Sequence, residues 1–162
     1  MTDPVLTRHK IAGGRGDEQL AARFADLAKN ADVRVVLEVL VALGRLHWSD
    51  APDWLSQHWK GGDPAIAHAA MQLLRRSDNW PAVLKLLDLP DRAEEGSPSL
   101  RALALQALAD RAEETVVDGV IERWKNESDP GRRGEYVDLL SRVYKKPAAW
   151  VYWGFRAAPR PA

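Results

Sequence analysis

The sequence contains no cysteine. This absence excludes a disulfide framework, a CxxCH haem attachment, a zinc knuckle and a thiol nucleophile from this stretch of chain. Neither sign of charge is in excess, because 23 lysines and arginines balance 23 aspartates and glutamates. A neutral chain has no general attraction for the phosphate backbone, so nucleic acid is not the expected partner.

Long hydrophobic runs are missing as well. No apolar stretch approaches the roughly 18 residues that a membrane span needs, and the start Met-Thr-Asp-Pro-Val lacks the basic and apolar regions of a signal peptide. We therefore expect no membrane span. The length of 162 residues, with 46% hydrophobic and 28% charged residues, is typical of one folded domain with a single buried core.

Motifs for catalysis or metal binding are also absent from the sequence. The histidines show no HExxH pattern and no pair spaced for a metal; they are His9, His47, His58 and His68. The glycine-rich stretch 13–16 lacks the lysine and hydroxyl residue of a phosphate-binding loop. Adjacent carboxylates such as Glu94 and Glu95 point about 100° apart on a helix and cannot cooperate. We expect no catalytic residue, no metal and no cofactor in this segment, and a protein that is not an enzyme.

What the sequence does contain is a repeated helix-start signal. Five segments open with a helix-capping residue, four of them followed by a proline suited to the first helical position. They begin at Asp3-Pro4, Asp32-Val33-Arg34, Asp63-Pro64, Ser97-Pro98 and Asp129-Pro130. The starts are separated by 29, 31, 34 and 32 residues. This spacing is too long for a heptad and suits a repeated unit of two helices.

Apolar residues recur at fixed distances from these caps. Eight residues after the cap stand Ile11, Leu40, Met71, Leu105 and Val137, and eleven after it stand Gly14, Leu43, Leu74, Leu108 and Leu140. Three after the cap stand Leu6, Val35, Ile66, Leu100 and Arg132. These spacings predict one apolar stripe along a helix. The second helices of each pair are expected at 32–46, 64–76, 98–111 and 130–144, and the first helices at 17–29, 51–60, 80–88 and 113–126. The first copy decays into glycines.

Helix pairs of this period cannot bury their apolar faces alone and must stack. The predicted fold class is therefore all-α, a right-handed α-solenoid of about four to five helix pairs over 1–146. Residues 147–162 are predicted to form a non-helical tail rich in aromatic residues and proline. This tail is either an extension of the domain or the start of a linker. The run Asp32-Val33-Arg34, leading to Ala42, Leu43 and Gly44, resembles the second helix of a HEAT repeat. The resemblance covers 17–146 and implies an architecture of HEAT-like pairs, whose second helices line a concave binding face.

The tail carries a narrower resemblance. Trp153-Gly154-Phe155-Arg156 and Pro159-Arg160-Pro161 are similar to the segment after the HEAT repeats of large planctomycete-type multidomain proteins, which join a dehydrogenase-like propeller, HEAT repeats and a c-type haem domain. The resemblance implies an exported or periplasmic parent protein with haem in another domain; otherwise the chain is expected to be cytoplasmic. A simpler alternative is that the tail aromatics pack on the last helix pair and close its core.

One column of mostly basic residues lies thirteen positions past the caps, at Arg45, Arg76, Asp110 and Arg142. The arginines suit favourable interactions with helix C-termini. A second interpretation is a basic ridge on the binding face, completed by His68, Gln72 and Gln106. Asp110 interrupts this ridge. The candidate surface for a partner comprises Arg45, His68, Gln72, Arg76, Gln106, Arg142, Trp150, Trp153 and Arg156.

The predicted function is a non-catalytic protein-interaction or spacer module, a fragment of a larger protein whose partner is another protein or another domain of the same chain; the oligomeric state is open. The alternative is a DNA-binding HEAT-like protein of the alkyl-base glycosylase type. Seven tryptophans are present. Trp59 and Trp124 end first helices at matching points, which favours packing between repeats over ligand stacking.

Overall fold

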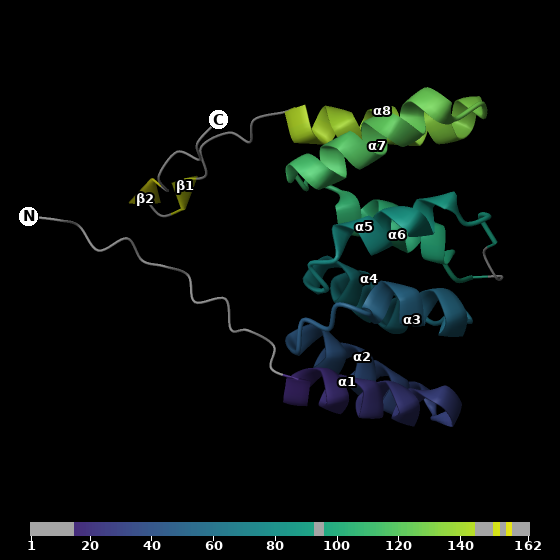
Figure 1. Ribbon diagram of the computed structural model, residues 1–162, viewed down its shortest axis with the longest axis vertical. Coiled ribbons are helices and arrows are strands. Elements are labelled where there is room, and N and C mark those ends of the chain that lie inside the picture. The colour runs from purple at the N-terminus through teal and green to yellow at the C-terminus, as the bar shows by residue number, and fades with distance from the viewer. Residues whose placement is uncertain (1–14, 93–95, 145–150, 153–154, 157–162) are drawn as a thin grey trace, which may run out of the picture. The chain divides into compact units, whose positions relative to one another are not determined.

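The computed structural model describes residues 15–92, 96–144, 151–152 and 155–156, and most of these residues are helical (Figure 1). The chain divides into two compact units, Met1–Ala107 and Leu108–Ala162. This division falls near the end of a helix, whereas the predicted domain boundary at 146/147 stays a prediction. Within the described ranges, no helix has both the length and the apolar character that crossing a membrane requires.

The first unit consists of consecutive helix pairs. Its elements are α1 (Arg15–Leu27), η1 (Ala28–Asn30), α2 (Val33–Arg45), α3 (Ala51–His58), α4 (Pro64–Arg76), α5 (Trp80–Lys85), η2 (Leu86–Asp88) and α6 (Leu100–Leu108), whose last residue belongs to the second unit. Helix α2 packs against both α1 and α4, and α3 packs against α4 and α5. The layers α1/α2, α3/α4 and α5/α6 follow one another in Figure 1.

The described residues of the second unit include one helix pair and two short strands. Helix α7 (Glu114–Asn126) packs against α8 (Pro130–Tyr144). The strands β1 (Val151–Tyr152) and β2 (Phe155–Arg156) pair antiparallel, with Val151 opposite Arg156. The four described tail residues are therefore extended, as the prediction of a non-helical tail requires.

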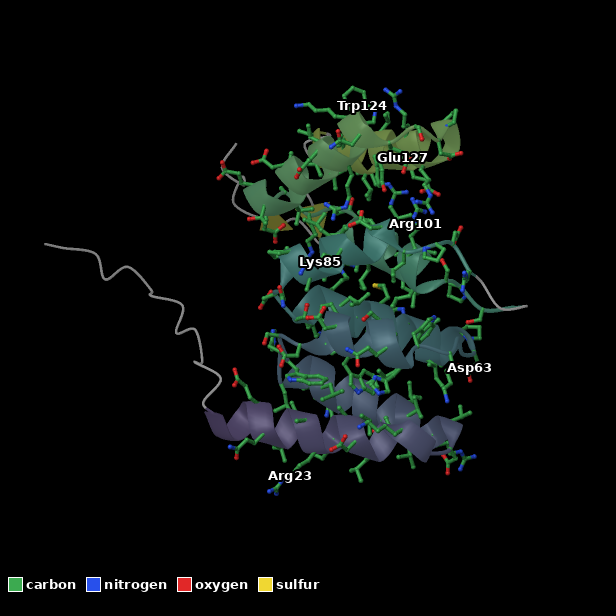
Figure 2. All side chains as sticks on the ribbon, turned by 45° about the vertical axis from the view of Figure 1, so that its right-hand side comes forward. Arg23, Asp63, Lys85, Arg101, Trp124 and Glu127 are labelled. Carbon is green, nitrogen blue, oxygen red and sulfur yellow. The ribbon has the colours of Figure 1, made fainter. Side chains whose placement is uncertain are left out.

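The capping residues explain why the helices begin where they do. Asp32 Oδ1 accepts hydrogen bonds from the backbone N–H of Arg34 and Val35, at 2.9 and 3.1 Å. Asp63 Oδ1 accepts from two backbone N–H groups of α4 in the same way, at 2.8 and 3.0 Å (Figure 2). These bonds satisfy donors that have no partner inside the first helical turn. The predicted helical spans are confirmed to within a few residues. The first cap signal, at Asp3, lies outside the described residues.

The predicted start of α6 was wrong by two residues. The helix was expected over 98–111, but it spans Leu100–Leu108 and its cap is Ser99, whose Oγ accepts from Ala102 N at 3.1 Å. Ser97 Oγ instead accepts from Gly62 N at 2.8 Å. Ser97 therefore connects two loops that are far apart in sequence, and a local pattern could not distinguish the two serines.

The C-terminal ends of α2, α4 and α6 share one backbone conformation. The second residue after each helix has a positive φ: 53° at His47, 54° at Asp78 and 63° at Asp110. After α2, His47 N donates to Gly44 O and Trp48 N to Leu43 O, both at 3.4 Å. This is the Schellman arrangement, which satisfies the last carbonyl groups of a helix.

The core lies along a slightly different stripe from the predicted one. Seven and eleven residues after the caps, the side chains are buried in every helix of the first unit that the alignment covers: Val39, Ala70 and Ala104, then Leu43, Leu74 and Leu108. Eight residues after the cap, Leu40 is buried, Met71 and Leu105 are half-buried, and Val137 is 49% exposed. Positions seven and eleven are one turn apart on the same face, so position eight lies at the edge of the stripe. Two alanines at position seven weaken the sequence signal there.

Candidate interaction face

Three predicted residues of α4 lie in one row. His68, Gln72 and Arg76 are spaced by four residues, which places them on the same side of a helix. His68 and Arg76 are exposed and Gln72 is half-buried, while the opposite side of α4 carries its buried residues. The row therefore forms part of the outer surface of the first unit.

Helix α2 places an equivalent residue beside this row, and α6 carries another at the matching position of the sequence repeat. Arg45 ends α2 as Arg76 ends α4, and both side chains are exposed. Because α2 and α4 pack against each other, these two arginines belong to adjacent helix ends. Gln106 is exposed on α6, at the distance from Ser97 that Gln72 has from Asp63. We refer to Arg45, His68, Gln72, Arg76 and Gln106 as the polar face.

A close approach of the two helices fixes the position of Arg76. A Cβ atom built on Gly44 of α2 would lie 3.6 Å from Arg76 Cδ and 3.8 Å from Leu73 Cα. The aliphatic part of Arg76 therefore lies against α2 while the residue as a whole stays exposed. The guanidinium group stands at the C-terminal end of α4, where the helix dipole favours a cation. Both interpretations of the arginine column are compatible with this geometry.

Two contacts connect the loops that follow the C-terminal ends of α2 and α4. His47 Nδ1 lies 3.4 Å from Asp78 Oδ2, and Asn79 Nδ2 donates to Ser49 O at 2.8 Å. Each contact joins the turn after α2 to the turn after α4. The loops beside Arg45 and Arg76 therefore hold a defined relative position.

The other predicted surface residues do not extend the polar face within the first unit. Arg142 is exposed on α8, in the second unit. Arg156 lies in β2, where the backbone alone is described, and Trp150 and Trp153 lie outside the described residues. Asp110 is not a helical residue, because it follows the end of α6 in a left-handed conformation.

The described tryptophans mostly serve packing. Trp48 and Trp80 are buried, and Trp48 packs at 6.3 Å from Trp54, measured between ring centroids. Trp59 Nε1 donates to Pro98 O at 3.3 Å, which links it to the loop before α6 as expected for a residue between repeats. In the second unit, Arg133 lies over the ring of Trp124 at 5.4 Å.

One arginine of the first unit is buried. Arg101 of α6 is 2% exposed, and its Nε donates to Leu87 O of η2 at 3.2 Å (Figure 2). This bond joins the two helical elements on either side of the longest loop. The apolar residues around Arg101 in the sequence gave no sign that its charged group would be buried.

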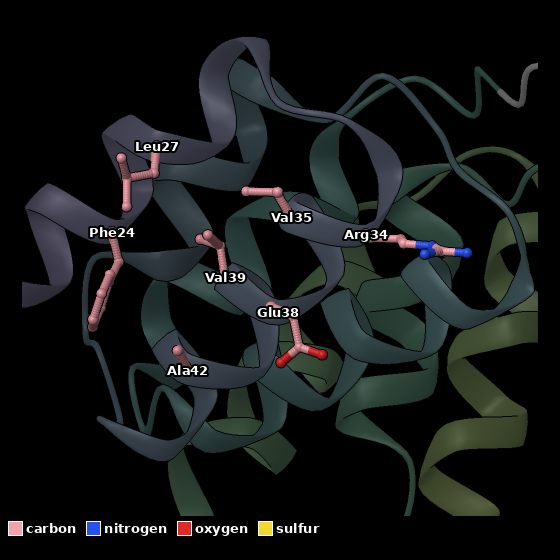
Figure 3. Close-up of a pocket in the computed structure, with 7 residues that line it drawn as sticks. All are labelled: Phe24, Leu27, Arg34, Val35, Glu38, Val39 and Ala42. Carbon is pink, nitrogen blue, oxygen red and sulfur yellow. The ribbon is translucent and has the colours of Figure 1, made fainter.

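An apolar groove opens between α1 and α2 (Figure 3). Its volume is about 390 Å³, and it is lined by Phe24, Leu27, Arg34, Val35, Glu38, Val39 and Ala42. Leu27 is 61% exposed and Val35 is 42% exposed, an unusual degree of exposure for large apolar side chains facing each other. This groove could not be predicted from the sequence, because the apolar stripe of α2 resembles that of α4.

Chemical groups for metal binding do not gather in the part of the chain that the structure describes, where no cluster of three or more His, Asp or Glu side chains could hold an ion. Comparison with known proteins identifies no relative: no protein-family model, no curated protein and no solved structure matches this chain.

Proposed function

We propose that the chain is a non-catalytic protein-interaction module, built as a right-handed α-solenoid of four to five HEAT-like helix pairs, and that the polar face binds an acidic segment of another protein or of another domain of the same chain. The observation that carries this proposal is the placement of Arg45 and Arg76 at adjacent, exposed ends of packed helices.

The arrangement of α2 and α4 supports the repeat architecture. The positions seven and eleven residues after the cap are buried in both helices, both helices start at an aspartate cap, and both end in the same left-handed turn. In such a stack, each repeat adds one row of exposed side chains to a continuous surface. The HEAT resemblance implies that second helices line the binding face, and all five residues of the polar face belong to second helices.

The side chains of the polar face fit an acidic peptide. Each arginine presents a planar fork of N–H donors that can hold a carboxylate through two bonds. Gln72 and Gln106 carry both a donor and an acceptor, which suits the backbone of an extended segment. His68 adds a further donor beside Gln72, one turn away on the same helix.

The test is binding of a short, fluorescein-labelled, glutamate-rich peptide to the full chain, followed by fluorescence anisotropy. The double variant Arg45→Gln/Arg76→Gln should weaken binding at least about tenfold, as expected for two charge-assisted contacts. The matched control is Arg23→Gln/Lys85→Gln, which removes the same charge from exposed residues outside the polar face (Figure 2).

Equal weakening in both double variants would show a general charge effect and contradict the proposal. A labelled DNA duplex is measured in parallel over a range of salt concentrations. Tighter binding to DNA than to the peptide, with a steep loss of affinity in salt, would favour the DNA-binding alternative.

A further inference from the structure

Exposed large apolar side chains gather on the first two helices. Among the described residues, these exposed side chains are Leu20, Leu27, Val33, Val35 and Val137. All but Val137 belong to α1 and α2, which form the first layer of the unit in Figure 1. On α1, Leu20, Phe24 and Leu27 are spaced by four and three residues, which places them in one row. Phe24 and Leu27 of this row line the groove.

The groove side of α2 is equivalent to a covered side of α4. Three, seven and ten residues after its cap, α4 has the buried residues Ile66, Ala70 and Leu73. The same positions of α2 are the groove residues Val35, Val39 and Ala42. A Cβ atom built on Gly44 of α2 would lie 3.8 Å from Leu73 Cα, so α2 itself covers this side of α4. No helix of the described part of the chain covers the groove side of α2 in the same way.

Two charged residues distinguish the groove side of α2 from that of α4. Arg34 and Glu38 line the groove, where α4 has Ala65 and Ala69 at the equivalent positions. Both charged residues are exposed and stand one helical turn apart. Their side chains extend in different directions in Figure 3, and neither forms an ion pair with another described residue. The apolar surface thus carries one unpaired charge of each sign.

A surface of this kind is complementary to itself. In a dimer with a two-fold axis, one patch contacts the same patch of the other copy, so two different residues that meet do so twice. Antiparallel α2 helices, with the axis midway between Arg34 and Glu38, would bring each arginine to the glutamate of the other copy. We propose that a second copy of this chain covers the groove, in a two-fold dimer held by the apolar residues of α1 and α2 and by two Arg34–Glu38 pairs between the copies.

The size of the patch indicates weak association. From Arg34 to Ala42, α2 extends over about 12 Å, and two packed helices are together about 20 Å wide. This surface is smaller than the roughly 800 Å² per partner that a stable interface buries. We therefore expect a dissociation constant on the order of 100 µM.

The test is sedimentation equilibrium of the full chain between about 5 and 500 µM, where the native chain should pass from monomer to dimer. Arg34→Glu and Glu38→Arg each bring like charges together twice across the two-fold axis. Each variant should weaken dimerisation at least about tenfold. The matched control is Lys85→Glu, which makes the same charge change as Arg34→Glu at an exposed residue of α5 and should dimerise as the native chain does.

Mixing the two reversal variants tests the pairing itself. Arg34→Glu has an acid at both positions and Glu38→Arg has a base at both, so one copy of each restores two opposite-charge pairs. The equimolar mixture should dimerise at concentrations where either variant alone is monomeric. The double variant Arg34→Glu/Glu38→Arg should also dimerise, because it exchanges the two charges within each copy.

Two further variants report on the apolar part of the surface. Leu27→Asp should abolish dimerisation without unfolding the chain, because Leu27 is 61% exposed. The chain has no cysteine, so Val35→Cys introduces a single thiol into the groove. Its reaction with a maleimide should slow as protein concentration rises. Val33→Cys is the control, because Val33 is 57% exposed and does not line the groove.

Three outcomes would overturn the proposal. A native chain that stays monomeric at every concentration would show that no second copy covers the groove. A mixture of the reversal variants that associates no better than either alone would show that Arg34 and Glu38 do not pair between copies. Protection of Val35→Cys that does not change with concentration would show that another part of the same chain covers the groove.

Discussion

His47 Nδ1 lies 3.4 Å from Asp78 Oδ2, and the two residues occupy the same place in successive repeats. Each is the second residue after its helix, α2 or α4, and each has a positive φ, 53° and 54°. Both side chains are more than half exposed, so solvent screens the contact and it contributes little to stability. The left-handed backbone turn therefore recurs in both repeats, although the residue at this position differs.

The left-handed turn predicts that glycine is more stable than the native residue at these positions. A side chain with a Cβ atom pays a steric cost in this conformation, which glycine avoids. His47→Gly and Asp78→Gly should each raise the free energy of unfolding by about 0.5–1 kcal/mol. The measurement is urea unfolding followed by tryptophan fluorescence.

The control is Asp53→Gly, at an exposed position within α3. Glycine has a low helix propensity, and the carboxylate of Asp53 in the first turn of α3 also favours the helix dipole, so this change should have the opposite sign. A loss of stability in both His47→Gly and Asp78→Gly would mean that the exposed contact between the two side chains matters more than the backbone turn.

The close packing of α2 against α4 at Gly44 predicts that only a small side chain is tolerated at this position. An added Cβ would already lie 3.6 Å from Arg76 Cδ, so a single methyl group fits but a larger side chain meets the neighbouring helix. Gly44→Leu should lower the free energy of unfolding by about 1–3 kcal/mol, as overpacking does. The measurement is the midpoint and slope of urea unfolding.

Gly134 of α8 is the matched control, because an added Cβ there meets no atom within 4 Å among the described residues. Gly134→Leu should raise helix stability by about 0.5–1 kcal/mol through its better helix propensity. Equal effects of leucine at Gly44 and Gly134 would contradict the close approach of α2 and α4.

The helical spans were predictable because their signals are local. An aspartate cap, a proline at the first helical position and an apolar stripe all act within a few residues, as at Asp63, Pro64 and Ile66. The left-handed ends at His47 and Asp78 were missed because neither residue is glycine, the usual sign of such a turn. The row of His68, Gln72 and Arg76 was predictable from helical spacing alone.

Features set by contacts between distant segments were beyond the sequence pattern. Ser97 is held by Gly62 N, which lies 35 residues away, and this removes it from the cap of α6. The burial of Arg101 depends on the carbonyl group of Leu87. The groove forms because one side of α2 has no neighbouring helix among the described residues. The sequence does not show this, since Val35 of α2 and Ile66 of α4 are both apolar although Val35 is much more exposed.

The burial of Arg101 predicts that removing its side chain lowers the free energy of unfolding considerably. Arg101→Ala would delete a buried side chain and leave Leu87 O without the bond from Nε, which is expected to cost about 2–4 kcal/mol in urea unfolding. Arg101→Met keeps most of the volume and should cost less. Arg23→Ala, at an exposed position of α1, should stay within about 0.5 kcal/mol. A cost for Arg101→Ala as small as that for Arg23→Ala would contradict its burial.

Ser97 and Ser99 accept hydrogen bonds from different backbone N–H groups, so replacing each serine should affect a different part of the chain. Ser99→Ala removes the acceptor for Ala102 N, so amide hydrogen exchange should accelerate at Ala102 and the free energy of unfolding should fall by about 1 kcal/mol. Ser97→Ala removes the acceptor for Gly62 N, so exchange should accelerate at Gly62, before α4, and leave the first turn of α6 protected. Nuclear magnetic resonance resolves both amides in one experiment. The residue that caps α6 controls hydrogen exchange at the N–H groups of its first turn. Faster exchange at Ala102 in the Ser97→Ala variant would therefore show that Ser97 caps α6, as the repeat spacing predicted.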